Sequence, residues 1–97
     1  MSLNNLGLAY RAKKVIIGTD VVLSLLKENK IYLVLLANDT SSNTIRKITN
    51  KTNESKTPIN NTYTKEELSK ALGKHNVSVV GIIDKGFSEL LNKKGSW

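Results

Sequence analysis

The chain has 97 residues and a formal net charge of +7, with 15 Lys and Arg against 8 Asp and Glu. This length favours one domain, because two hydrophobic cores would each be too small to be stable alone. A hydrophobic content of 39% with 24% charged residues excludes wholesale disorder. The absence of cysteine excludes disulfides, thiolate metal sites and thiol catalysis. We predict a single domain over residues 1–97, with its core at about 3–92 and a flexible tail at 93–97.

The apolar segments are short, and the longest is Ile31–Ala37. A membrane-spanning helix needs about 20 apolar residues, so we expect none. The amino-terminal segment is polar at its start and basic at its end, the reverse of a secretory signal, which favours a cytoplasmic location. The excess of positive charge favours a polyanionic partner, with nucleic acid ahead of an anionic membrane surface.

The first third of the chain predicts a helix, a strand and a second helix. Apolar residues at helical spacing within 3–10 are followed by basic residues, which suit the negative end of a helix dipole. A short buried strand over 15–17 ends at Gly18, and Thr19 or Asp20 is expected to cap the next helix. The inward side chains of that second helix are expected to be Val22, Leu25 and Leu26.

The middle of the chain predicts a strand and a helix, followed by a weakly patterned segment. The unbroken apolar run 31–37 indicates a strand covered on both faces. Residues 38–42 hold several good capping residues, so a third helix should begin there. Its apolar stripe is expected to be Ile45, Ile48 and Thr52. Over 52–62 we expect no firm structure beyond a marginal strand within 59–63.

The last third predicts a capped helix, a strand and a final helix. Thr64 and Glu67 fit a capping box, in which each side chain satisfies the other residue's backbone N–H. Gly73 is expected to end this fourth helix, and 77–83 is expected to form a second strongly buried strand. The expected inward side chains are Leu68, Ala71 and Leu72 in the fourth helix and Phe87, Leu90 and Leu91 in the last.

Strands alternate with helices along the whole chain. This order predicts an α/β protein, a three-layer α/β/α sandwich around a small mixed four-stranded sheet. A ferredoxin-like α+β domain is the alternative. The runs 31–37 and 77–83 favour the sandwich, because they look buried on both faces of the sheet.

Residue patterns for catalysis are almost absent. His75 is the only histidine, so neither a histidine metal cluster nor a histidine–cysteine pair can form. The only adjacent carboxylates, Glu66 and Glu67, are better explained as favourable charge at a helix start. The glycines occur singly, which excludes a glycine-rich phosphate loop. We expect no enzyme activity, no metal and no cofactor.

Two segments have the composition of binding sites. Gly18, Thr19 and Asp20 begin a helix, where free N–H groups and the dipole can receive a phosphate, although Asp20 also suits simple helix capping. The loop 73–77 combines a cation, polar groups and an apolar residue, which suits an unpaired base but also an ordinary turn.

Five segments follow one another along the chain: LGLAYRAKK, the Gly18–Thr19 helix start, IYLVLLANDTS, TKEELSKALGK and VSVVGIIDKGF. Together and in this order, they resemble the kink-turn-binding ribosomal protein family of the L7Ae and L30e type. The resemblance covers about 6–91 and is greatest to a bacterial single-domain branch, the YlxQ-like proteins. It implies a three-layer α/β/α fold. It also implies cytoplasmic binding of ribosomal or other structured RNA that contains a sharp internal bend.

The resemblance implies RNA-contacting residues in four segments. They are Gly18, Thr19 and Asp20 at the second helix start, Ser41 and Ile45 after the second strand, Lys65 in the fourth helix, and Lys74, His75, Asn76 and Val77 before the last strand. The charge and position of Lys14 suggest an additional phosphate contact. If this site is correct, Lys14, Lys65 and Lys74 should converge on one face together with Gly18 and Ile45.

The chain departs from the family at the second helix. Strong kink-turn binders carry Asn-Glu and, after two further residues, Lys behind the Gly-Thr pair, where this chain has Asp20, Val21 and Ser24. Ionised Asp only accepts hydrogen bonds, Val21 lacks the acceptor, and Ser24 lacks the cation. We therefore predict a non-catalytic, monomeric, ribosome-associated RNA-binding protein with an altered kink-turn site and no membrane partner. The alternative is a protein–protein adaptor that has lost RNA specificity, as apolar Val21 suggests.

Overall fold

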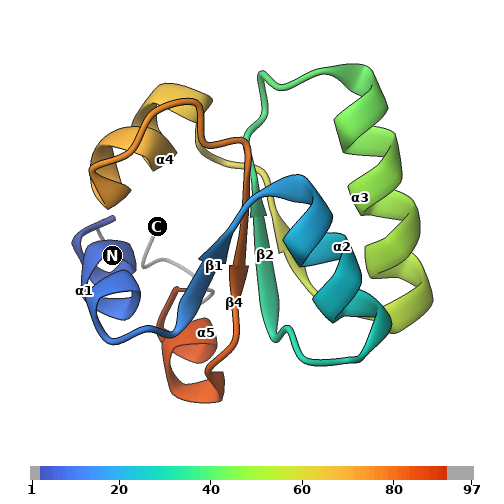
Figure 1. Ribbon diagram of the computed structural model, residues 1–97, viewed down its shortest axis with the longest axis horizontal. Coiled ribbons are helices and arrows are strands. Elements are labelled where there is room, and N and C mark those ends of the chain that lie inside the picture. Colours follow the sequence, from blue (N-terminus) through green and yellow to red (C-terminus); the bar gives the residue numbers. More distant parts are fainter. Residues whose placement is uncertain (1–2, 92–97) are drawn as a thin grey trace.

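The computed structural model describes residues 3–91, and within this range the chain forms five helices around a four-stranded sheet (Figure 1). The elements in chain order are α1 (Asn4–Arg11), β1 (Val15–Ile17), α2 (Thr19–Lys27), β2 (Leu33–Leu36), α3 (Ser42–Ser55), β3 (Ile59–Asn60), α4 (Lys65–Leu72), β4 (Val79–Ile82) and α5 (Lys85–Leu91). The tail expected at 93–97 lies outside the described residues.

The sheet is mixed and has the strand order β1-β4-β2-β3. Strand β4 is antiparallel to both β1 and β2, whereas β2 and β3 are parallel. This pairing brings the C-terminal ends of β1, β2 and β3 to the same end of the sheet as the start of β4. We call it the upper end of the sheet and the opposite one the lower end, as they lie in Figure 1.

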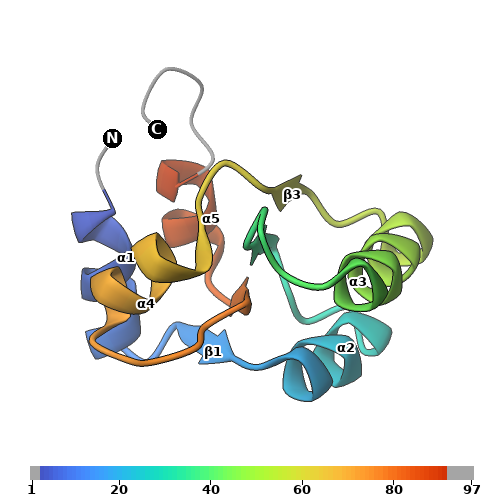
Figure 2. The same ribbon diagram turned by 90° about the horizontal axis from the view of Figure 1, so that it is seen from above.

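Helices cover both faces of the sheet, which confirms the predicted three-layer sandwich. Figure 2 shows α1, α4 and α5 on one side of the strands and α2 and α3 on the other. Two hydrophobic clusters fill the spaces between the layers. In β2, Leu33 and Leu35 join the cluster under α1, α4 and α5, and Val34 and Leu36 join the other cluster. Each such buried side chain stabilises the fold by about 1.5–3 kcal/mol.

Helix α3 is longer than predicted, because 52–55 continue it. Its inner stripe is confirmed, since Ile48 and Thr52 are buried and Ile45 packs against the cluster below α2 and α3. The Thr52 hydroxyl donates to the Thr49 carbonyl, so this buried polar group is satisfied within the helix. The helix ends at Lys56, which adopts left-handed backbone geometry with φ of 56°. The marginal strand is confirmed as two residues at the sheet edge.

Two details of helix placement were predicted incorrectly. Helix α2 is capped by Gly18 rather than by Thr19 or Asp20, because the Gly18 carbonyl already accepts the Val22 N–H. In α5, Leu90 points outward and is 41% exposed, and Ser88 is buried in its place. Side chains four residues apart share a helix face, so 87 and 91 lie together on the core side and 90 lies away from them.

Helix α4 follows the predicted pattern. The Glu67 N–H donates to the Thr64 hydroxyl at 3.1 Å, and the Thr64 N–H donates to the Glu67 carboxylate at 3.0 Å. This is the predicted capping box. Gly73 ends the helix in left-handed geometry, with φ of 66°.

Candidate nucleic-acid interface

Four segments far apart in sequence meet at the upper end of the sheet. They are the start of α2, the loop before α3, the loop before α4 and the loop before β4. Backbone hydrogen bonds join them directly: Gly18 N–H donates to the Val79 carbonyl at 3.0 Å, and Ala37 N–H donates to the Ser78 carbonyl at 2.8 Å. Asn38 N–H donates to the Tyr63 carbonyl at 2.9 Å. The upper end is therefore one connected surface.

Helices α2, α3 and α4 all begin at this surface, so the positive ends of three helix dipoles gather there (Figure 1). Their N-terminal N–H groups are satisfied differently. Ser41 caps α3 and Thr64 caps α4 with side-chain oxygens. Helix α2 has no side-chain cap, because its N-cap residue is Gly18. Of the three, α2 therefore offers the most accessible backbone donors to an anion.

Gly18 has a backbone conformation that other residues rarely adopt, with φ of 120° and ψ of 143°. It lies where the chain turns from β1 directly into α2. A Cβ added there would have no atom within 4 Å, so open space lies beside the backbone. The requirement for glycine is therefore conformational, and it leaves the start of α2 open to a ligand.

A shallow polar groove runs between α4 and the loop that precedes β4. It is lined by Asp39, Lys65, Glu66, Ser69, Lys70, Lys74, His75 and Asn76. The Asp39 carboxylate accepts the Lys65 N–H at 2.8 Å and so supports the start of α4. The Ser69 hydroxyl accepts the Val77 N–H at 2.9 Å, which fixes the loop to the helix. The groove therefore presents three lysines and two carboxylates, an excess of one positive charge, on a well-supported backbone.

Most of the predicted contact residues lie at the upper end. Those placed there are Gly18, Thr19, Asp20, Ser41, Ile45, Lys65, Lys74, His75 and Asn76. Ile45 lies in the first turn of α3, where its N–H donates to the Ser41 carbonyl. Val77 belongs to the same loop, but its side chain is only 2% exposed and packs in the core. It supports the loop from below and offers almost no contact surface.

Lys14 does not join the others, which corrects the expectation that the three lysines converge. It immediately precedes β1, and its carbonyl accepts the Ile83 N–H at the lower end. Strand β1 separates it from Gly18 by four residues, about 13 Å at the usual rise of a strand. We therefore exclude Lys14 from the site.

Sequence reasoning missed Lys70 and Asp39, which line the groove beside the predicted residues. Lys70 lies one helical turn after Glu66, so the spacing in the sequence already indicates that the two side chains share a face of α4. Asp39 had no such signal, because its bond to Lys65 joins positions 26 apart in sequence.

The positions that depart from the family pattern lie on the surface. Asp20, Val21 and Ser24 are all exposed, and Val21 is 48% exposed. Their side chains therefore contribute little to the core. The departures change the chemistry of the upper end rather than the fold.

Within residues 3–91, no group of three His, Asp or Glu side chains is placed to hold a metal ion. In the same range no helix has the length and apolar character required to cross a membrane.

The fold and site define a small α/β/α sandwich with a polar, lysine-lined groove at the end of the sheet where three helices begin. The chain belongs to the ribosomal protein L7Ae/L30e/S12e/Gadd45 family, whose model matches residues 2–92. It is 41% identical over 86 residues to the RNA-binding protein YlxQ of Bacillus subtilis, covering 89% of this chain and 86% of that protein. It is 33% identical over 88 residues to the RNA-binding protein YlxQ of Enterococcus faecium, covering 91% and 84%. These relatives confirm the resemblance to the YlxQ-like branch.

Solved structures support the same assignment. A protein of unknown function from Bacillus halodurans superposes with a TM-score of 0.86 and 32% identity, covering 90% of this chain and 88% of that one. The 15.5 kD RNA-binding protein of Giardia lamblia superposes with a TM-score of 0.79 over 90% of this chain and 75% of that one. At 17% identity the second comparison establishes the shared fold alone.

Proposed function

We propose that this chain is a non-catalytic protein that binds structured RNA through the upper end of its sheet. The observation that carries the proposal is the convergence there of the start of α2, which has no side-chain cap, and the lysine-lined groove beside α4. Both features favour phosphate, the first through backbone N–H groups and the second through side-chain charge. The RNA-binding relatives named above support the same partner.

The surface combines two kinds of contact. Lys65, Lys70 and Lys74 supply affinity for the RNA backbone, which carries no base identity. His75 and Asn76 are exposed polar groups in the loop, where they can meet the edges of an unpaired base. Ile45 is half-buried and offers an apolar contact one turn into α3.

We further propose that the partner is ribosomal or other structured RNA with a sharp bend of the kink-turn type. The protein binds it as a monomer in the cytoplasm. Recognition of the bend is weakened relative to strong binders, because Asp20, Val21 and Ser24 replace two hydrogen-bonding groups and one cation. Each lost contact corresponds to about 1–3 kcal/mol, by analogy with direct base readout.

The test is a titration of the protein against a kink-turn RNA and a straight duplex of equal length, at several salt concentrations. We expect tighter binding of the bent RNA, with log K falling linearly as log salt rises. Equal affinity for the two RNAs would contradict recognition of the bend and would leave only binding to the RNA backbone. Failure to bind either RNA near 0.15 M salt, the physiological ionic strength, would overturn the proposal.

Val21 favours a second candidate function, a protein–protein adaptor. Its apolar side chain is 48% exposed at the start of α2, where the family pattern has a charged residue. The variant Val21→Glu separates the two functions. It should strengthen RNA binding if the surface contacts RNA, whereas it would disrupt an apolar protein contact and leave RNA affinity unchanged if the surface is an adaptor site.

A further inference from the structure

A second groove lies between α1 and α4, beside the proposed RNA surface. Its volume is about 820 Å³, and its apolar lining includes Leu3, Leu8 and Ala71. Leu8 is 48% exposed. Figure 2 shows α1 and α4 next to each other on one side of the sheet. The groove is thus an accessible apolar surface that the family-derived site does not include.

Close packing of the two helices shapes the groove. A Cβ at Gly7 would lie 3.2 Å from the Ala71 carbonyl oxygen, tighter than ordinary van der Waals contact. Glycine at this position lets the backbones of α1 and α4 approach closely. The groove therefore lies over a helix contact that a larger side chain would force apart.

Tyr10 gives the groove an aromatic wall. Its ring packs against the core, and the Lys74 ammonium lies 5.4 Å from the ring centroid. This distance is a cation–π contact, which contributes only about 0.5–1 kcal/mol at an exposed site. Lys74 is exposed, so a flat ligand can displace its ammonium from the ring at small cost.

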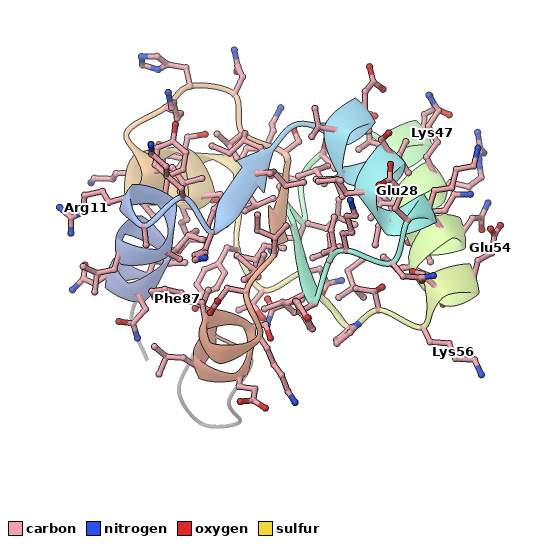
Figure 3. All side chains as sticks on the ribbon, turned by 60° about the horizontal axis from the view of Figure 1, so that its bottom comes forward. Arg11, Glu28, Lys47, Glu54, Lys56 and Phe87 are labelled. Atoms are coloured by element: carbon pink, nitrogen blue, oxygen red, sulfur yellow. The ribbon has the colours of Figure 1, made fainter. Side chains whose placement is uncertain are left out.

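The charges around the groove suit a nucleotide. Arg11 and Lys70 line it, and the Lys74 ammonium lies over the ring of Tyr10, which belongs to the lining. Figure 3 shows Arg11 extending outward from α1. The one carboxylate in the lining, Glu67, already accepts the Thr64 N–H in the capping box. The groove thus combines an aromatic ring with three cations in or beside its lining, the combination that binds single-stranded nucleic acid by stacking and phosphate attraction.

Lys70 lines both grooves, which are therefore adjacent. We propose that the α1–α4 groove binds an unpaired nucleotide that flanks the structured RNA held at the upper end. The base stacks on Tyr10, and Lys74 moves from the ring to the phosphate. This inference rests on the proposed function, because it requires that the RNA is bound next to the groove.

The test compares one structured RNA with the same RNA carrying four unpaired nucleotides at its 5′ end or at its 3′ end. One of the extensions should raise the affinity of the unmodified protein by about tenfold, the effect of stacking one base. Tyr10→Leu should abolish this gain and leave affinity for the unextended RNA unchanged. Tyr32→Leu is the matched control, because Tyr32 is exposed and precedes β2 at the lower end.

Arg11→Gln provides a second test that does not depend on the packing of Tyr10, because Arg11 is exposed. It should reduce the gain by about threefold and leave the melting temperature unchanged. The inference is overturned if neither extension raises affinity, or if Tyr10→Leu retains the gain. Absence of binding to the unextended RNA would instead contradict the proposed function, so the two failures are distinguishable.

Discussion

Both ends of the sheet carry cations, but they differ in which helices begin and finish there. At the upper end α2, α3 and α4 begin, whereas at the lower end α1, α2 and α3 finish and α5 begins. At the lower end Lys13, Lys27 and Lys56 lie at the negative ends of helix dipoles, and only Lys85, among the described lysines there, begins a helix. At the upper end Lys65 lies in the first turn of α4, beside a positive helix end, whereas Lys70 and Lys74 lie near the end of the same helix and share its groove with Lys65.

This difference shows why the net charge of +7 does not locate a binding site. Lys14 and Lys74 contribute equally to the total, yet Lys74 shares a groove with the start of α4, whereas Lys14 lies at the opposite end of the sheet. Figure 3, with the lower end brought forward, shows Lys56 pointing away from the body where α3 finishes. The start of three helices at the upper end, against one at the lower end within residues 3–91, distinguishes the two ends.

The largest expected effect is a gain of function at the upper end. The triple variant Asp20→Asn, Val21→Glu and Ser24→Lys restores the family pattern on exposed positions. It should bind a kink-turn RNA at least tenfold more tightly, because it regains two or three contacts of about 1–3 kcal/mol each. Titration against bent and straight RNA measures the change. An equal gain for the straight duplex would show that only charge has increased.

Gly18→Val tests the special backbone of the upper end. Its φ of 120° is unfavourable for a β-branched residue, so the variant should lose about 1–3 kcal/mol of unfolding free energy in urea denaturation. Gly73→Asn is the control, because φ of 66° is left-handed geometry that asparagine tolerates. The turn residue Asn29 at the lower end already has a similar φ, 57°. Equal losses in the two variants would contradict this distinction.

The smallest effect concerns alkaline pH. Burial, and secondarily the nearby Glu67 carboxylate, raises the pKa of Tyr63 above its usual value of 10.0. The folded protein therefore holds this proton more tightly than the unfolded chain. The resulting stability is fully present below pH 10 and is lost as pH rises through the folded-state pKa. Tyr63→Phe should flatten the fall of the melting temperature above pH 10, and the exposed Tyr32→Phe should retain it.

Local signals in the sequence were sufficient for much of the fold. The Thr64–Glu67 capping box and the apolar runs in β2 and β4 each depend on neighbouring residues, and the structure confirms them. The end of α3 was missed, because 52–55 have the composition of a loop and are held in the helix by packing and by hydroxyl bonds to the backbone.

The site was less predictable than the fold, because it depends on which strands finish at the same end of the sheet. Lys14 and Gly18 are four residues apart in sequence, yet a single strand places them at opposite ends. Val77 belongs to the predicted contact loop although it begins the predicted buried run 77–83, and its side chain packs in the core. The position of Lys14 depends on strand order, which does not follow from local sequence, whereas the burial of Val77 was already indicated by its apolar run.

The most direct test compares the removal of two positive charges at the upper end of the sheet with the removal of two at the lower end. The double variants Lys65→Gln/Lys74→Gln and Lys14→Gln/Lys27→Gln have the same net charge and modify the upper and lower ends respectively. Titration with the kink-turn RNA across salt concentrations should show about tenfold weaker binding for the upper-end variant, with its salt slope reduced by about two. The lower-end variant should bind nearly as the unmodified protein does. Equal weakening of both variants would contradict an organised RNA surface at the upper end.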